Sequence, residues 1–331
     1  MMSNPDKILV NDWGHFTEGT DDKIRISVKE GRKNSTVWLA AALFISTLIL
    51  FSAASGESPR SAERVSAKVS DSFPSALTPF PGITAHTYLV KILGKDVVLA
   101  RQKEWKELPP ASLTKLLTAL LAYENLNPAK NYVFSPDAVQ VEEKISGAIP
   151  GEEFLMEDVI SFALISSAND AAGLLAEKIG EKYGGADFDE KISVFLALAN
   201  KKAGDIGLLN SHFLNPAGLD ADDHFSTAED LAILSEYIWY NHPEIWELLR
   251  TPEKTIISAS GKEYKIENTN ELLKEFPAIL GGKTGFTDNA KGTLILLYPV
   301  KTGDIAVVII LGSDDRFGDG RKIIRWLETS F

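Results

Sequence analysis

The sequence predicts an α+β domain that runs from residue 82 to residue 331. Three observations lead to this fold class. Strand-like runs stand near the start of this region, a second pair of such runs stands near its end, and long helical stretches lie between them. Strands at both ends with helices between them predict one sheet that joins the two ends of the domain.

The first two predicted strands form a hairpin, and a buried helix follows. His86–Leu93 and Asp96–Arg101 flank Gly94–Lys95, a pair typical of a tight turn. Leu113–Tyr123 is apolar nearly all round, which predicts a buried helix. Ser112 precedes this helix at the position where an N-cap is expected.

The remaining elements follow in order along the chain. Asp158–Ile179 and Thr227–Tyr240 are long helical stretches. Two β-branched runs, Thr293–Pro299 and Asp304–Leu311, are separated by a short polar turn and predict a second hairpin. The last predicted helix is Arg321–Thr329.

The region before the domain predicts a membrane anchor. Residues 37–54 form an uncharged apolar run of 18 residues, long enough to span most of a bilayer. Lys29, Arg32 and Lys33 precede it, which predicts a cytoplasmic tail over residues 1–36 and an extracytoplasmic domain. Residues 55–81 are rich in Ser, Ala and Pro and predict a linker. The alternative is a signal peptide cleaved after the small residues Ser52–Ala54.

Composition excludes several classes of function. Residues 1–36 carry six basic and six acidic side chains, so the rest of the chain carries the whole net charge of −12. An acidic body argues against nucleic acid as a partner. The chain has no cysteine, and its five histidines form no His-x-x-x-His pair, so we expect no metal and no cofactor.

The first of three short motifs is Ser112-Leu113-Thr114-Lys115. Positions i and i+3 share a helix face, so the Ser112 hydroxyl and the Lys115 amine can meet. A serine nucleophile needs a base, and no His/Asp partner is evident, which leaves a neutral lysine for this role. Burial and a second nearby cation are the two features that would favour the neutral amine.

The other two motifs supply polar groups of the same kind. Ser167-Ala168-Asn169 interrupts a helical run, and its hydroxyl and amide can pass a proton and hold a carbonyl. Lys283-Thr284-Gly285 offers a cation, a hydroxyl and, at the glycine, close approach of a ligand to a strand backbone. A phosphate-binding loop is excluded there, because Pro277 stands where its first glycine is required.

In this order, the three motifs resemble the Ser-x-x-Lys, Ser-x-Asn and Lys-Thr-Gly set of penicillin-recognising enzymes. The segments around Ser112 and Ser167 closely resemble those of the low-molecular-weight D-alanyl-D-alanine carboxypeptidases, serine peptidase family S11. Further similar segments are Phe213–Asp220, His224–Ala232 and Asn268–Leu273. The similarity covers roughly residue 83 to the end, and it implies an antiparallel sheet flanked by helices with a mostly helical subdomain.

The resemblance also implies roles for individual residues. Ser112 would be acylated and Lys115 would take its proton, with Ser167 and Asn169 shaping proton transfer. The oxyanion hole would use the backbone N–H groups of Ser112 and Phe286. The residues expected to bind the substrate are Lys283, Thr284, Gly285, Phe286 and Arg316.

The implied substrate is a peptidoglycan stem peptide ending in D-Ala-D-Ala, and β-lactams would act as acylating inhibitors. Three alternatives remain open: a D,D-endopeptidase, a sensor without turnover, and a β-lactamase. The last is disfavoured because Ile206 stands where a Glu-x-x-Leu-Asn turn would place its glutamate. Asn215, His224 and Asp230 are interpreted as structural residues.

Overall fold

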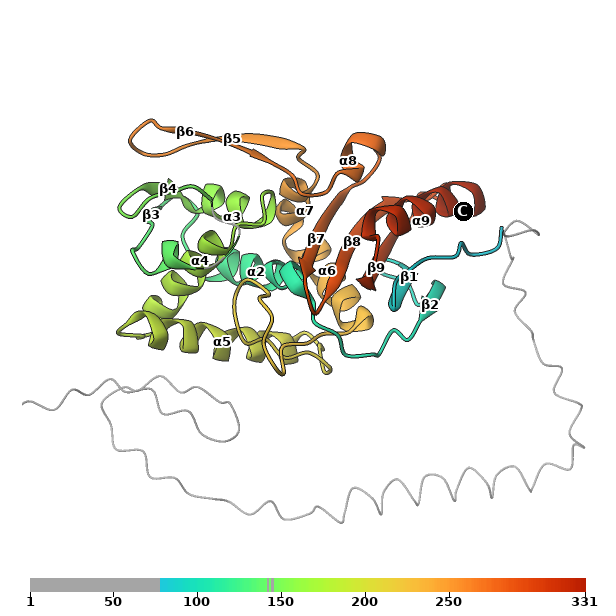
Figure 1. The fold of residues 1–331 in the computed structure, drawn as a ribbon, viewed down its shortest axis with the longest axis horizontal. Coiled ribbons are helices and arrows are strands. Elements are labelled where there is room, and N and C mark those ends of the chain that lie inside the picture. Colours follow the sequence, from blue (N-terminus) through green and yellow to red (C-terminus); the bar gives the residue numbers. More distant parts are fainter. Residues whose placement is uncertain (1–77, 142, 144–145) are drawn as a thin grey trace, which may run out of the picture. The chain divides into compact units, whose positions relative to one another are not determined.

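Both ends of the described chain meet in one antiparallel sheet, as the sequence predicts. The computed structural model describes residues 78–331 except 142, 144 and 145 (Figure 1). The sheet has the strand order β2-β1-β9-β8-β7, and every pair of neighbours is antiparallel. Its strands are β1 (Thr87–Ile92), β2 (Val98–Gln102), β7 (Gly281–Thr287), β8 (Lys291–Pro299) and β9 (Ile305–Ser313).

The central strand β9 is buried on both faces of the sheet. Val307, Ile309 and Leu311 pack into one hydrophobic core, whereas Val308 and Ile310 pack into a second core on the opposite face. Helices therefore cover both faces, which explains why this strand reads as an unbroken apolar run instead of alternating with polar residues.

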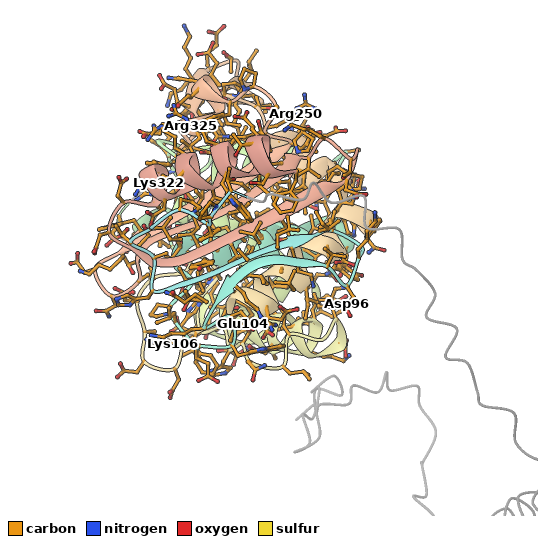
Figure 2. All side chains as sticks on the ribbon, turned by 90° about the vertical axis from the view of Figure 1, so that its right-hand side faces the viewer. Asp96, Glu104, Lys106, Arg250, Lys322 and Arg325 are labelled. Atoms are coloured by element: carbon orange, nitrogen blue, oxygen red, sulfur yellow. The ribbon has the colours of Figure 1, made fainter. Side chains whose placement is uncertain are left out.

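One face is covered by helix α9 (Arg316–Ser330) together with the short helix α8 (Leu272–Glu275). The outer side of α9 carries Lys322 and Arg325, and Arg325 pairs with Glu275 of α8 (Figure 2). The helix begins five residues earlier than predicted, because the side chain of Asp315 accepts a hydrogen bond from Gly318 N and caps it.

The other face carries helix α6 (Ala228–Asn241) and the helical subdomain (Figure 1). Helix α2 (Lys115–Asn125) lies inside this subdomain and is buried from Lys115 to Ala122, as its apolar sequence predicts. The helices around it are α3 (Met156–Leu164), α4 (Asn169–Lys182), α5 (Phe188–Asp205) and α7 (Pro243–Leu249). Two antiparallel strand pairs and two 3-10 turns complete the fold: β3 (Asn131–Val133), β4 (Glu153–Leu155), β5 (Glu253–Ile257), β6 (Glu263–Glu267), η1 (Ala111–Thr114) and η2 (Ala138–Gln140).

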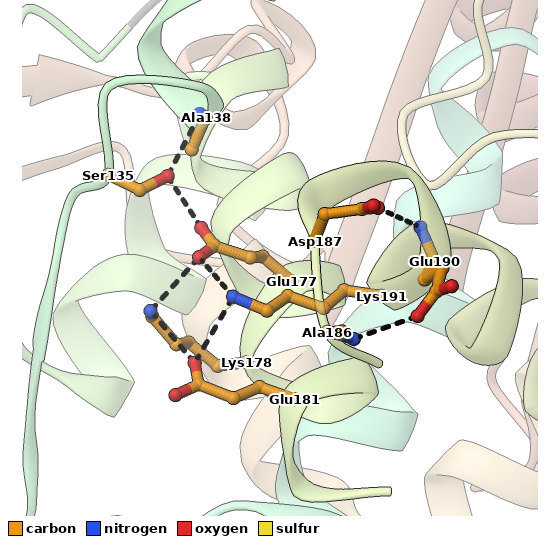
Figure 3. A network of polar contacts seen from close by, with 9 residues as sticks. All are labelled: Ser135, Ala138, Glu177, Lys178, Glu181, Ala186, Asp187, Glu190 and Lys191. Carbon is orange, nitrogen blue, oxygen red and sulfur yellow. Dashed lines mark hydrogen bonds and ion pairs between the residues drawn. The ribbon is translucent and has the colours of Figure 1, made fainter. Parts of the chain in front are cut away.

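A buried carboxylate ties α4 to its neighbours. Glu177 accepts hydrogen bonds from Ser135 Oγ at 2.6 Å, from Lys178 Nζ at 3.1 Å and from Lys191 Nζ at 3.4 Å (Figure 3). Lys191 belongs to α5, and Ser135 precedes η2. The network therefore fixes α4 between these two segments, and α4 carries one residue of the second motif at its first position.

The folded part begins earlier than predicted. Residues up to 81 were expected to be a linker, yet Trp326 Nε1 donates to Thr78 O at 2.8 Å. The ring of Phe80 stacks on Tyr88 with centroids 4.7 Å apart. The predicted tail (1–36), the predicted transmembrane helix (37–54) and the linker up to residue 77 lie outside the described residues. Within residues 78–331, apart from the three gaps, no helix is long and apolar enough to cross a membrane.

Candidate active site

Ser112 lies in the tight turn η1, directly before the buried helix α2. Its neighbour Ala111 adopts φ = +50°, a left-handed conformation that is uncommon for residues with a side chain. The predicted N-cap role of Ser112 is wrong, because Thr114 occupies the N-cap position of α2. The Ser112 hydroxyl instead contacts the amine of Lys115, with Nζ and Oγ 2.9 Å apart.

The side chain of Lys115 is fully buried, and its amine is surrounded by oxygen atoms. Besides Ser112 Oγ, Nζ donates to Asn169 Oδ1 at 2.7 Å and to the carbonyl oxygen of Ala217 at 2.7 Å. The predicted pairing of Ser112 with Lys115 is therefore present in the structure. The hydrogen bond from Lys115 to Asn169 brings the first motif into direct contact with the second motif.

The second motif is a sharp turn between two helices. The predicted helix Asp158–Ile179 is divided into α3 and α4, and Ser167 between them adopts φ = +61°. Its hydroxyl accepts a hydrogen bond from Lys283 Nζ at 2.9 Å, and Ser167 and Lys283 are both fully buried. Because a left-handed serine costs conformational energy, the turn is held by its surroundings. Lys283 belongs to the third motif, so all three motifs converge.

The third motif lies on β7, the edge strand of the sheet, which packs against η1. A Cβ atom on Gly285 would lie 2.4 Å from Thr293 Oγ1 and 2.8 Å from the backbone nitrogen of Ser112. Close approach of a ligand was the predicted reason for this glycine. The structure gives another reason, because the space for a side chain is taken by the chain around Ser112 itself.

The other predicted substrate-binding residues are Thr284, Phe286 and Arg316. Thr284 Oγ1 lies 2.6 Å from Thr269 Oγ1, within the similar segment Asn268–Leu273. Phe286 is 53% exposed, and the guanidinium carbon of Arg316 lies 5.7 Å from the centre of its ring. Burial lowers the pKa of the Arg316 guanidinium. Its Nε is buried and has no acceptor among the residues that the structure describes.

Sequence reasoning missed one contributor to the site, the carbonyl group of Ala217. Asn215 and His224, which were interpreted as structural, lie close behind it: Asn215 Oδ1 accepts from Gly218 N at 2.7 Å, and Asn215 Nδ2 lies 3.2 Å from His224 Nδ1. A backbone carbonyl leaves no side-chain signature. The only feature of the sequence that could have pointed to the Ala217 carbonyl is the turn-forming segment Asn215–Leu219 around it. Asp230 does act structurally, since its Oδ2 accepts hydrogen bonds from Asn210 N and from Ser211 Oγ, both at 2.7 Å.

Comparison with known proteins agrees with this geometry. Residues 75–314 match the family model described as D-alanyl-D-alanine carboxypeptidase. The chain belongs to this family. The match spans all three motifs and ends just before Arg316, so the family assignment rests on the segment that builds the site.

Individual relatives are 30 to 32% identical to this chain over the aligned residues. The D-alanyl-D-alanine carboxypeptidase DacB2 of Mycobacterium tuberculosis is 32% identical over 67% of this chain and 73% of the relative. DacF of Bacillus subtilis, another D-alanyl-D-alanine carboxypeptidase, is 30% identical over 71% of this chain, which spans only 59% of the length of DacF. A D-alanyl-D-alanine endopeptidase of Pseudomonas aeruginosa is also 30% identical, over 67% of this chain and 70% of the relative.

A solved structure has the same fold. The crystal structure of a D-alanyl-D-alanine carboxypeptidase from Mycobacterium tuberculosis superposes with a TM-score of 0.67 at 29% identity. The superposition covers 77% of this chain and 95% of that chain. The antiparallel sheet with a helical subdomain is thus the fold of a solved family member.

The buried His224 makes stability depend on pH. Burial lowers the pKa of His224 from 6.5 to about 4, so folding favours the neutral ring. The stabilisation is complete above pH 6.5 and is lost as the pH falls through 4. The loss amounts to about 3 kcal/mol in the free energy of unfolding. Urea unfolding of the wild type and of His224→Asn between pH 4 and pH 7.5 checks this, and equal pH slopes in the two proteins would contradict it.

Proposed function

We propose that this chain is a serine-type D-alanyl-D-alanine carboxypeptidase that removes the terminal D-alanine from peptidoglycan stem peptides. The observation that carries the proposal is the 2.9 Å contact between Ser112 Oγ and Lys115 Nζ in a buried site. A hydroxyl in contact with a buried amine has a general base at hand, which a serine nucleophile requires. Membership of the family supplies the substrate class.

Acylation begins when neutral Lys115 takes the proton of Ser112 and Oγ attacks the carbonyl carbon of the penultimate D-alanine. The negative charge of the tetrahedral intermediate falls on the former carbonyl oxygen, which the backbone N–H groups of Ser112 and Phe286 stabilise. The C–N bond then breaks, and the departing D-alanine amine receives a proton from the Lys115 ammonium. Ser167, in contact with Lys283, and Asn169, in contact with Lys115, help to direct this transfer.

Deacylation repeats the sequence with water as the nucleophile. Lys115 takes a proton from the water, whose oxygen attacks the ester carbonyl. The bond between the acyl carbon and Oγ then breaks, the Lys115 ammonium returns the proton to Ser112 Oγ, and the shortened peptide leaves with a new carboxyl group. β-Lactams follow the first half of this path. Their opened ring blocks the site until the ester is hydrolysed, so they act as inhibitors.

The carboxylate of the leaving D-alanine is recognised along β7. Lys283 and Thr284 supply a cation and a hydroxyl, and Gly285 allows this strand to lie against Ser112. Arg316, whose buried Nε lacks an acceptor within the described part of the chain, adds a second cation beside Phe286. Charge-assisted hydrogen bonds of this kind are the strong ones in protein recognition.

The proposed place of action is the cell wall, on the extracytoplasmic side of the membrane. Residues 37–54 would form a single-pass anchor, residues 1–36 a cytoplasmic tail, and residues 55–77 a tether to the catalytic domain. This proposal is supported by the uncharged run of 18 residues and by the basic residues before it.

Release of D-alanine tests the proposed function. The full-length chain, incubated with diacetyl-Lys-D-Ala-D-Ala, is expected to liberate free D-alanine, and Ser112→Ala is expected to liberate none while unfolding at the same temperature as the wild type. A crosslinked peptide dimer serves as the second substrate. Cleavage of the dimer without release of D-alanine from the tripeptide would identify an endopeptidase. Binding of penicillin without either reaction would identify a sensor.

A pair of arginine variants tests the carboxylate site. Arg316→Ala is expected to raise KM for the D-Ala-D-Ala peptide about tenfold to a hundredfold, because one hydrogen bond between charged groups is lost. Arg325→Ala is the matched control. Arg325 lies on the same helix but is exposed and pairs with Glu275, so its removal should leave KM unchanged. Equal KM values in the two variants would remove Arg316 from the site.

A further inference from the structure

The turn Asn215–Leu219 touches both groups that react in the first step. The carbonyl oxygen of Ala217 accepts a hydrogen bond from Lys115 Nζ at 2.7 Å. Gly218, at φ = +86°, packs so closely on η1 that a Cβ atom there would lie 1.8 Å from Ala111 O and 2.9 Å from Ser112 N. The turn therefore lies directly against the nucleophile and its base, although no residue in it carries a reactive side chain.

Asn215 holds this turn in shape. Its Oδ1 accepts from three successive backbone N–H groups, those of residues 217, 218 and 219, at 3.2, 2.7 and 2.9 Å. Its Nδ2 donates to Leu219 O at 2.9 Å, which closes the turn from the other end. Thr118 Oγ1 adds a bond of 2.7 Å to Pro216 O. Because so many bonds converge on five residues, the Ala217 carbonyl has little freedom to move.

His224 connects this turn to the nucleophile segment. Leu214 N donates to its Nδ1 at 3.4 Å, and Asn215 Nδ2 lies 3.2 Å from the same atom. Nδ1 is therefore the acceptor, which leaves the proton on Nε2 to be donated to Thr114 Oγ1 at 3.1 Å. Thr114 lies between Ser112 and Lys115 in the sequence, so the neutral ring of His224 fixes the turn and the reacting segment relative to each other.

The chemistry of an amine explains what the carbonyl of Ala217 does. A neutral amine on a lysine has two N–H bonds and one lone pair in tetrahedral directions. Asn169 Oδ1 and Ala217 O lie 2.7 Å from Nζ and are placed to accept its two N–H bonds. With its N–H bonds directed to these two acceptors, the lone pair can face the hydroxyl of Ser112, 2.9 Å away. After the proton passes from Oγ to Nζ, the ammonium can donate to all three of these oxygen atoms.

We propose that the turn Asn215–Leu219 is a positioning element for the general base, in which Asn215 and His224 hold the Ala217 carbonyl so that the lone pair of Lys115 faces Ser112. The inference rests on the proposed roles of Ser112 and Lys115. Asn215 and His224 are positioning residues, since they act through the Ala217 carbonyl and through Thr114 and touch neither the substrate nor the reacting atoms.

The rate of acylation by a fluorescent penicillin tests this inference. Its dependence on penicillin concentration, measured on the full-length chain, separates the dissociation constant of the first complex from the rate constant of acylation. Asn215→Ala is expected to lower the acylation rate constant about a hundredfold, the effect of misplacing a catalytic group by roughly 1 Å, and to leave the dissociation constant within about threefold. Asn215→Asp keeps an acceptor for the three N–H groups and is expected to recover to within about tenfold of the wild type.

Asn200 provides the matched control. It makes the same kind of clasp on Phe213, accepting from its N at 2.9 Å and donating to its O at 2.8 Å, but it touches neither the turn nor Lys115. Asn200→Ala is expected to lower the unfolding temperature and to acylate as fast as the wild type. The inference is overturned if Asn215→Ala acylates at the wild-type rate. It is equally overturned if Asn215→Ala and Asn200→Ala lose rate and affinity to the same extent, which would indicate a structural role only.

The test also covers a variant that does not fold and a wild type that is not labelled. If Asn215→Ala does not fold, His224→Asn takes its place, and a wild-type acylation rate in this variant would overturn the inference. His224→Asn retains an acceptor for the Asn215 amide but loses the bond to Thr114, so a slower acylation step at unchanged affinity is expected. Absence of labelling in the wild type would reject the proposed function itself, and the inference with it. Failure of the inference alone leaves the wild type fully labelled.

Discussion

Everything in this site depends on keeping the amine of Lys115 buried and still surrounded by hydrogen-bond acceptors. Burial disfavours the charged form, which suits a base, but buried N–H groups still require partners. The fold supplies them from separate segments: Asn169 at the start of α4 and the Ala217 carbonyl after α5. Lys283, equally buried, comes from the edge strand of the sheet. The site exists only where the helical subdomain and the sheet meet, so the packing between them is part of the chemistry.

Much of the architecture was predictable because strong local patterns determine it. The apolar run over β9 and the apolar helix α2 are buried on all sides. Their sequences therefore predict buried elements, whichever neighbours pack around them. Elements that depend on a partner were harder to predict. The start of α9 requires the side chain of Asp315 as a cap ahead of two glycines that weaken helix formation. The hairpin β5–β6 is short and half-exposed, and only its alternate residues Ile256, Tyr264 and Ile266 pack inward.

The same distinction holds within the site. The motif residues could be recognised because each places a reactive side chain at a fixed spacing. The structure joins Ser112 and Asn169 through Lys115, and it joins Ser167 to Lys283. The contribution of Ala217 could not be predicted, since any residue there has the same carbonyl group. Two glycines, Gly218 and Gly285, admit the turn and the strand to the backbone of Ser112 from separate parts of the chain. Their positions in the sequence do not indicate that both lie against Ser112.

The proposed reaction forms its covalent intermediate on the hydroxyl of Ser112. The most direct measurement is mass spectrometry of the protein after reaction with penicillin and digestion with trypsin. The cleavage sites at Lys106 and Lys115 release a peptide from Glu107 to Lys115 that contains Ser112 and Thr114. The account predicts a penicilloyl adduct on this peptide, with fragment ions that place it on Ser112. An adduct on Thr114 or on any other peptide, or an unmodified folded protein, would contradict it.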